Sequence, residues 1–251
     1  MKLGIFINNE PFYKKGAMKI IKILNKLNIN FEVCSKDSNY DILIVNGGDG
    51  TVFKVAKEYP DAALLPLKRL GFPVSIALEK IKNGDYVIEK LMRLEVKYKN
   101  FRAWGINDIS VLRDDESANR FRVFINGKDA FGDELIGDGV VVATPHGSTA
   151  YNWTAGGMVL RENEKGFIIT PICSIYSSKR VLMKNRKVMK RIEKSKMIQD
   201  NEEVVIKFSR NIKNKIVPDG RKEERFYADV KDGDEVKIKK AREYSKFVKI
   251  L

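Results

Sequence analysis

The chain is poor in the side chains that build metal centres and covalent active sites. Its 251 residues contain one histidine, His146, and two cysteines, Cys34 and Cys173, which lie far apart. A zinc or iron site needs several such ligands close together, so we expect no tightly bound protein metal. The cysteine spacing also excludes a Cys-X-X-Cys redox pair and favours reduced thiols. A Ser-His-Asp triad would have to use His146, and nothing around that residue suggests one.

Long apolar runs are missing as well. No stretch reaches the roughly 18 apolar residues that a transmembrane helix needs. The opening residues, Met1 to Asn8, contain too short an apolar stretch for a signal peptide and are typical of a strand. We therefore expect a cytoplasmic protein without a membrane partner. The Walker-type Gly-Lys-Ser motif and the protein-kinase catalytic loop are also absent, so a phosphate site would have to be built in another way.

Acidic residues are outnumbered by basic ones. The chain has 47 Lys and Arg residues against 33 Asp and Glu, a formal net charge of +14. This excess favours polyanionic partners such as nucleotides, polyphosphate, nucleic acid or anionic lipid. No zinc-finger, RRM or KH pattern occurs, so we expect no nucleic-acid partner. For the seven basic residues between Lys184 and Lys196, a solvated loop or helix face is favoured over a phosphate site.

A strand, a glycine-rich turn and a helix start follow one another directly in the first part of the chain. Ile42 to Val45 is an apolar, mostly β-branched run of the kind found in buried parallel strands. Residues 47–51 read Gly-Gly-Asp-Gly-Thr, and Val52 to Tyr59 has apolar residues at helical spacing. Backbone N–H groups and a helix dipole hold phosphate in this arrangement, and glycines let the backbone approach the ligand closely. We therefore expect a phosphate site at Gly47, Gly48, Gly50 and Thr51.

A carboxylate, Asp49, lies among these glycines. It would repel a phosphate, so phosphate binding alone does not explain its presence. A general base for a hydroxyl group, or a metal contact, would explain it, and we take Asp49 as the candidate catalytic residue. The alternative is a tight turn in which Asp49 only caps the following helix.

The hydrophobic pattern divides the chain into two domains. Strand patterns at 2–7 and 30–34 alternate with helix patterns at 14–27 and 84–94, which predicts an open α/β domain over residues 1–95. From residue 96 to 239, short strand runs are separated by turn signals such as Asn126-Gly127, which predicts a larger antiparallel β-rich domain. The pattern leaves open whether the tail 240–251 returns to the first domain.

Two further segments carry polar groups next to strands. Asn107 and Asp108 place an amide beside a carboxylate, a pair able to hold both hydroxyls of a ribose; a turn-forming Asn-Asp pair is the alternative. Residues 138–151 begin Asp-Gly, continue through a strand at 140–143, and end in Thr-Pro-His-Gly-Ser-Thr-Ala-Tyr. The last residue, Tyr151, offers a flat ring in a small-residue loop.

With these three segments in this order, the chain resembles the NAD kinase family. The resemblance runs from the first strand to about residue 220 and also includes Leu70-Gly71-Phe72, residues 169–172 and Pro218-Asp219-Gly220. It implies phosphorylation of the 2′-hydroxyl of the adenosine ribose of NAD, an active site between the two domains, Mg²⁺ or another divalent cation with ATP, and a homodimer or homotetramer. The NAD-binding residues that it implies are Asp49, Gly50, Lys54, Asn107, Asp108, Asp138, His146, Thr149, Ala150, Tyr151, Asn152, Thr154 and Cys173.

Two departures from the family pattern affect this site. Asp108 stands where the family usually has a longer Glu, and Leu67-Lys68-Arg69 replaces a Gly-Ile-Asn loop that shapes the nucleotide site. Two other functions share part of the pattern: a lipid or other small-molecule kinase with only the glycine turn, and a non-catalytic basic nucleotide-binding protein. The choice between ATP and polyphosphate as donor, and between NAD and NADH as acceptor, stays open.

Overall fold

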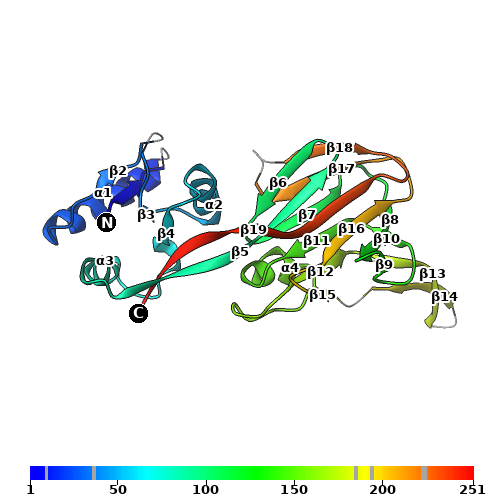
Figure 1. Cartoon of the computed structure of the whole chain (residues 1–251). Coiled ribbons are helices and arrows are strands. Elements are labelled where there is room, and N and C mark those ends of the chain that lie inside the picture. Colours follow the sequence, from blue (N-terminus) through cyan, green and yellow to red (C-terminus); the bar gives the residue numbers. More distant parts are fainter. Residues whose placement is uncertain (9–10, 36–37, 184–185, 193–194, 222–224) are drawn as a thin grey trace. The chain divides into compact units, whose positions relative to one another are not determined.

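The computed structural model describes residues 1–8, 11–35, 38–183, 186–192, 195–221 and 225–251. The chain forms two compact units, one of residues 1–91 with 244–251 and one of residues 92–243. Two long strands, β5 (Tyr86–Tyr98) and β19 (Glu235–Ile250), carry the chain from one unit to the other (Figure 1). The domain limits expected from the sequence, 95/96 and 239/240, fall inside these two strands.

The N-terminal unit is an open parallel sheet. Its strands are β1 (Leu3–Phe6), β2 (Glu32–Val33), β3 (Ile42–Val45) and β4 (Ala63–Pro66), in the order β2-β1-β3-β4. All of them pair in parallel, and the end of β19 adds a further parallel strand beside β4 through Lys246 and Phe247. The predicted α/β architecture is confirmed.

Helices cover both faces of this sheet. α1 (Pro11–Lys26) and α3 (Val74–Asn83) pack their apolar residues with Ile42 and Ile44 of β3 in one buried cluster. Leu43 and Val45 alternate to the opposite face, where α2 (Asp49–Glu58) contacts β3 and β4. A 3₁₀ turn, η1 (Leu67–Arg69), follows β4. Because β3 is buried on both faces, the turn after it is held at a fixed edge of the sheet.

The predicted helix at Gly84–Leu94 is wrong. α3 ends at Asn83, and Gly84 adopts a left-handed conformation, with φ of 83°, that closes the helix. The segment from Tyr86 continues as β5, which pairs with β6 (Phe101–Gly105) and β19. Strand pairing with a distant part of the chain therefore determined this segment more than its local apolar spacing did.

The β-rich unit is built from two antiparallel sheets. One has the order β14-β13-β10-β8-β16-β19, and the other the order β15-β12-β11-β7-β17-β18. Their facing residues form one large core that includes Phe121, Phe167 and Phe208. The remaining elements are β7 (Asp108–Arg113), β8 (Asn119–Ile125), β9 (Lys128–Asp129), β10 (Leu135–Gly137), β11 (Gly139–Ala143), η2 (His146–Thr149), α4 (Tyr151–Thr154), β12 (Phe167–Ile172), β13 (Ile175–Met183), β14 (Arg186–Arg191), β15 (Lys196–Ile198), β16 (Glu203–Phe208), β17 (Ile212–Pro218) and β18 (Phe226–Val230).

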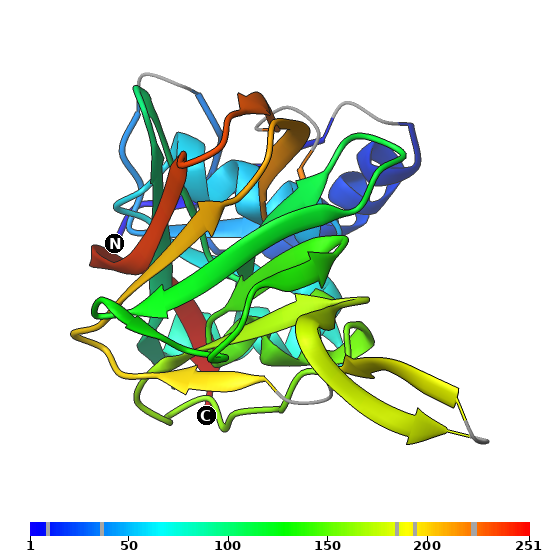
Figure 2. The same ribbon diagram turned by 90° about the vertical axis from the view of Figure 1, so that its right-hand side faces the viewer.

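Two local predictions in this unit have different outcomes. The Asn126-Gly127 hairpin is confirmed, since both residues have positive φ and β8 pairs antiparallel with β9 across them. The basic stretch 184–196 is neither loop nor helix over 186–191 but strand β14, whose residues 187–191 are exposed. Residues 184–185 and 193–194 lie outside the described residues. The hairpin of β13 and β14 extends away from the rest of the unit, in yellow in Figure 2.

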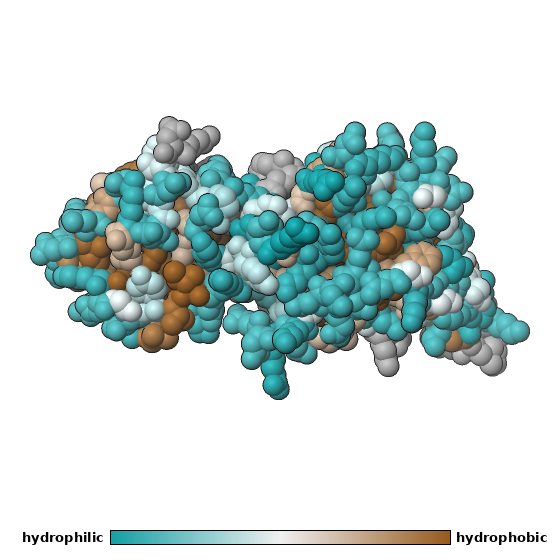
Figure 3. All heavy atoms as spheres, viewed as in Figure 1, coloured by the Kyte–Doolittle hydropathy of each residue, from teal (hydrophilic) through white to brown (hydrophobic). Residues whose placement is uncertain are grey.

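Hydrophilic side chains predominate on the face of the β-rich unit seen in Figure 3. This agrees with the high charged fraction of the chain, 32%. Over the part of the chain that the structure describes, no helix has both the length and the apolar character needed to cross a membrane.

Candidate active site

The glycine turn joins the buried strand β3 to the exposed start of α2. Gly48 is the N-cap of α2, so Asp49 lies in the first turn of the helix. At Gly47 a Cβ atom would collide with the side chain of Thr51, which explains that glycine by packing alone. At Gly48 and Gly50 a Cβ would meet nothing within 4 Å, and neither residue has a positive φ. The packing and φ therefore do not require glycine at these two positions, and glycine there leaves the backbone open to close approach by a ligand.

Two acidic–basic pairs lie along this turn and helix. The Asp49 side chain is largely exposed, and its Oδ1 accepts hydrogen bonds from Arg69 Nη2 at 2.9 Å and Nε at 3.2 Å. Lys54 lies one turn further along α2, with its Nζ 3.8 Å from Glu58 Oε1. The carboxylate that would serve as base is thus oriented by a guanidinium from η1.

In the β-rich unit, the carboxylate of Asp219 binds three consecutive backbone amides. Asp219 Oδ1 accepts hydrogen bonds from the N–H groups of Ile106, Asn107 and Asp108 at 2.9, 2.7 and 3.3 Å. Asp219 itself adopts a left-handed conformation, with φ of 51°, beyond the end of β17. Its backbone N–H donates to the Asp108 carbonyl at 2.9 Å. These contacts fix the backbone from which the Asn107 and Asp108 side chains project.

Asn107 and Asp108 are both buried polar residues. Asn107 Oδ1 has no hydrogen-bond partner within the described residues, which is uncommon for a buried oxygen. A ligand hydroxyl could donate the missing hydrogen bond. Burial, and secondly the charge of Asp219, raise the pKa of the Asp108 carboxyl from 3.8 to about 7. One residue thus offers an acceptor, and the other a carboxyl group that titrates near neutral pH.

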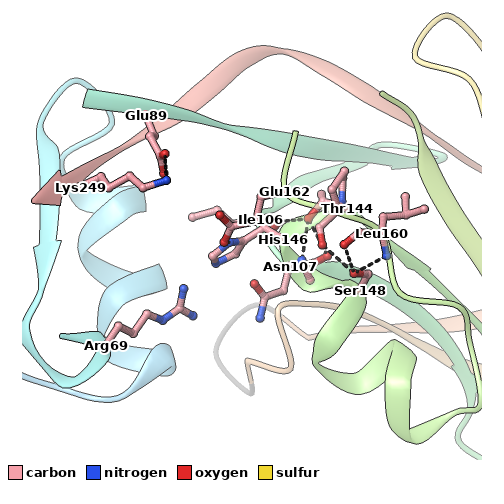
Figure 4. Close-up of polar contacts among 12 residues, drawn as sticks. Arg69, Glu89, Ile106, Asn107, Thr144, His146, Ser148, Leu160, Glu162 and Lys249 are labelled. Atoms are coloured by element: carbon pink, nitrogen blue, oxygen red, sulfur yellow. Dashed lines mark hydrogen bonds and ion pairs between the residues drawn. The ribbon is translucent and has the colours of Figure 1, made fainter. Parts of the chain in front are cut away.

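The loop after β11 packs against the same segment (Figure 4). Thr144 Oγ1 donates to the Ile106 carbonyl at 2.7 Å and accepts from the Gly147 N–H at 3.0 Å. The Thr144 N–H donates to the Asn107 carbonyl at 2.9 Å. A Cβ at position 147 would overlap the Asn107 carbonyl oxygen, so this position requires glycine. The loop 144–151 and the segment 106–108 therefore form one rigid assembly.

The other predicted residues of this loop differ in how exposed they are. Asn152 is fully buried: its Nδ2 donates to the Ser148 and Met158 carbonyls, and its Oδ1 accepts from Thr170 Oγ1 at 2.7 Å. Thr149 and Thr154 are exposed, and Ala150 is half-buried. His146 Nδ1 lies 3.8 Å from Glu162 Oε1. In this structure Asn152 holds the loop together, whereas Thr149 and Thr154 are accessible to a ligand.

Tyr151 and Asp138 line a shallow cavity. Burial raises the pKa of the Tyr151 hydroxyl, and the Asp108 and Asp138 carboxyls and the Cys173 thiol add to the effect. Asp138 Oδ1 accepts from Arg113 Nε at 2.6 Å. The cavity has a volume of about 520 Å³, and its lining includes Asp138, Tyr151, Arg113 and Lys215. Cys173 is exposed in the turn between β12 and β13.

A larger cavity, of about 600 Å³, lies on the face of β5, β6 and β19 around Trp104 and contains none of the predicted residues. The chemistry of the predicted residues therefore favours the smaller cavity.

Two residues that position the site, Arg69 and Asp219, were not predicted from the sequence. Asp219 had a signal, because Pro218-Asp219-Gly220 belongs to the family resemblance, but its contacts reach residues 111 to 113 positions away. Arg69 lies in the loop that departs from the family pattern, and only the folded turn brings it to Asp49.

Solved structures with the same fold include an NAD kinase and an NADH kinase. The crystal structure of an NAD kinase from Archaeoglobus fulgidus in complex with ATP has a TM-score of 0.71 at 19% identity, covering 100% of this chain and 94% of that one. Yeast NADH kinase complexed with NADH has a TM-score of 0.75 at 19% identity, covering 100% of this chain and 84% of that one. These likenesses establish the fold.

Sequence comparison identifies the family. Residues 107–250 match the ATP-NAD kinase C-terminal domain. An NAD kinase of Carboxydothermus hydrogenoformans is 31% identical over 98% of this chain and 84% of its own length. An NAD kinase of Caldanaerobacter subterraneus subsp. tengcongensis is 35% identical over 85% of this chain and 75% of its own length. The chain belongs to the NAD kinase family.

Proposed function

We propose that this protein transfers a phosphoryl group from ATP or polyphosphate to the 2′-hydroxyl of the adenosine ribose of NAD, giving NADP. Membership of the NAD kinase family over nearly the whole chain carries this proposal. It also favours NAD kinase activity over a lipid kinase that shares only the glycine turn. Gly48 and Gly50, which the fold itself does not require, support phosphate binding at that turn.

The N-terminal unit supplies the groups for phosphoryl transfer. The backbone of residues 47–51 and the N-terminus of α2 receive phosphate oxygens of the donor. Asp49 accepts the proton of the ribose 2′-hydroxyl while that oxygen bonds to the terminal phosphorus. The bond from this phosphorus to the bridging oxygen breaks, and the shortened donor leaves with the electron pair. Lys54 lies one turn along α2 as a further source of positive charge.

The β-rich unit supplies the groups that recognise NAD. Asn107 and Asp108 bind the ribose hydroxyls, because both are buried and Asn107 Oδ1 lacks a partner within the described residues. By resemblance to the family we assign Thr149 and Ala150 to the adenine side, and His146 and Thr154 to the rest of the NAD site. Asp138, Tyr151 and Cys173 form the nicotinamide side, next to the cavity of about 520 Å³. We assign Asn152 to the support of this loop, since its amide is used by internal hydrogen bonds.

A divalent cation such as Mg²⁺ would be bound mainly by the donor phosphates. Among the described residues no group of three His, Cys, Asp or Glu side chains is arranged to hold a metal ion. Asp49 is exposed beside the proposed phosphate position and offers carboxylate oxygen, which suits Mg²⁺. The ion would neutralise charge on the phosphates.

The experiment that tests this proposal is an assay of the purified protein with Mg²⁺. NAD or NADH serves as acceptor, and ATP or polyphosphate as donor; NADP or NADPH is measured with a dehydrogenase specific for the product. Product formation that requires both a donor and Mg²⁺ is expected. If no acceptor is phosphorylated by either donor, or if diacylglycerol is phosphorylated instead, the proposal is overturned.

A further inference from the structure

The contact between Arg69 and Asp49 occupies the carboxylate that the reaction needs. The two bonds that Arg69 donates to Asp49, from Nη2 and from Nε, end on the same oxygen, Oδ1. The two side chains come from η1 and from the first turn of α2, and both are partly or largely exposed. The pair is therefore accessible to a ligand at the N-terminus of α2.

A polyanionic donor placed at this turn meets one unfavourable charge, the Asp49 carboxylate. The guanidinium of Arg69 lies within hydrogen-bond distance of that carboxylate, and its planar set of N–H donors matches phosphate oxygens as well as carboxylate oxygens. A bound phosphate therefore competes with Asp49 for Arg69. When the phosphate takes the place of Asp49 as partner of Arg69, the negative charge of the phosphate is partly neutralised. At the same time Asp49 Oδ1 is freed to accept a proton.

Two other basic side chains of these elements, Lys68 and Lys54, have other described partners. Lys68 lies over the ring of Tyr13, 5.0 Å from its centroid and 3.4 Å from its hydroxyl. Lys54 is close to Glu58, one turn further along α2. Figure 4 shows the Arg69 side chain extended from its turn with the guanidinium outermost. Arg69 is thus the basic residue placed directly at the proposed base.

We propose that Arg69 is a donor-binding residue, whose guanidinium passes from Asp49 to a phosphate oxygen of the donor when ATP or polyphosphate binds. In the absence of donor Arg69 is bonded to Asp49 Oδ1, and donor binding frees that oxygen. This inference rests on the proposed function, because it assigns a contact of the same donor site. It concerns η1, which follows β4 of the N-terminal unit.

The test separates phosphate binding by Arg69 from mere support of Asp49. Binding of ATP and of inorganic tripolyphosphate, without NAD, is measured by calorimetry for Asp49→Asn and for the double variant Asp49→Asn with Arg69→Gln. In this background there is no carboxylate to support. If Arg69 binds phosphate, the double variant is expected to bind both ligands about ten-fold or more weakly than Asp49→Asn does. A difference below about two-fold overturns the inference.

Two further variants sharpen the result in the otherwise unchanged protein. Arg69→Lys keeps the charge but not the planar fork and is expected to recover only part of the affinity lost in Arg69→Gln. Lys68→Gln removes the same charge from the same turn and is expected to change donor affinity less than about three-fold. In the kinase assay, Arg69→Gln is expected to raise KM for the donor and to leave KM for NAD within about two-fold.

The outcome is distinguishable from failure of the proposed function. If the wild type forms NADP but Asp49→Asn and the double variant bind ATP equally, only the role of Arg69 is overturned. If the wild type binds ATP but phosphorylates neither NAD nor NADH, the kinase proposal fails while the binding comparison still decides the role of Arg69. Absence of any ATP or tripolyphosphate binding overturns the inference directly.

Discussion

Asp49 is exposed on α2 and makes its described hydrogen bonds through one carboxylate oxygen, so its removal should leave the fold intact. We predict that Asp49→Asn lowers kcat for NADP formation by about two to four orders of magnitude, because the amide keeps the size of the side chain but accepts no proton at neutral pH. NAD affinity should stay within about three-fold, as measured by calorimetry. A variant that keeps a tenth of the wild-type turnover would remove Asp49 from the role of base.

Asp108, which we propose as a ribose-binding residue, has a cost in stability. Its pKa is raised from 3.8 to about 7 by burial and by Asp219, so the folded protein binds more protons than the unfolded chain between these pH values. The contribution of Asp108 to the free energy of unfolding therefore falls as pH rises from about 4 and is lowest above about 7.

We predict that Asp108→Asn stabilises the ligand-free protein at pH 8 by a few kcal/mol, on the order of 2–4, because it replaces a buried charge by a neutral group of the same shape. The gain should shrink towards zero near pH 4, and NAD affinity should fall at least ten-fold. Thermal unfolding at both pH values measures the first effect, and calorimetry measures the second. Asp61→Asn, in an exposed turn, is the matched control and should show neither. A gain of equal size at both pH values would contradict this account.

At the scale of elements, the positions of the polar residues in the loop 144–151 and in the segment 106–108 depend on the packing of these two segments against each other. The hydrogen bonds of Thr144 hold them together, and Gly147 allows the loop to approach the Asn107 carbonyl closely. We predict that Gly147→Ala displaces Asn107 and weakens NAD binding more than ten-fold, since a misplaced polar group loses its ligand bonds. ATP binding, which we assign to residues 47–51, should change less than about two-fold. Calorimetry with each ligand separately measures both.

The control for this change is another glycine of the β-rich unit. Gly127 has a φ of 76°, but a Cβ there would meet no atom within 4 Å. Gly127→Ala should therefore cost about 1–2 kcal/mol of stability through backbone strain without changing NAD affinity. If both variants weaken NAD binding equally, general destabilisation and not the position of Asn107 is the cause.

The sequence predicted correctly those elements whose conformation is determined by neighbouring residues. β3 was predicted with its observed ends because four buried apolar residues are bounded by polar and glycine residues, and the β8–β9 hairpin because Asn126-Gly127 favours positive φ at both positions. The helix predicted at 84–94 failed because β5 is determined by pairing with β19, about 150 residues away. The hydrogen bonds from the backbone of residues 106–108 to Asp219 and the Arg69–Asp49 contact were not predicted for the same reason. Both depend on residues that only the folded chain brings together.

At the scale of the whole molecule, the C-terminal strand closes both units. β19 pairs with β16 over Glu235–Lys239 and with β4 at Lys246 and Phe247, and Val248 belongs to the apolar cluster of the N-terminal unit. The last residues of the chain thus complete a sheet that the first residues begin. The N-terminal unit therefore contains contacts between segments distant in sequence, which tend to form slowly.

The number of subunits in the active protein is a further property of the whole molecule. Family resemblance implies a homodimer or homotetramer in which the position of Cys173 reaches the NAD of a neighbouring subunit, and Cys173 is exposed here, beside the groups near Tyr151. We predict that Cys173→Arg weakens NAD binding at least ten-fold, because a long cation fills space that NAD needs, and leaves ATP binding unchanged. Calorimetry with each ligand measures this effect. Multi-angle light scattering at assay concentration is expected to show a dimer or tetramer. An active monomer would exclude a contribution of the neighbouring subunit to the NAD site. An effect of Cys173→Arg on NAD binding would then arise within one chain, next to the cavity at Asp138 and Tyr151.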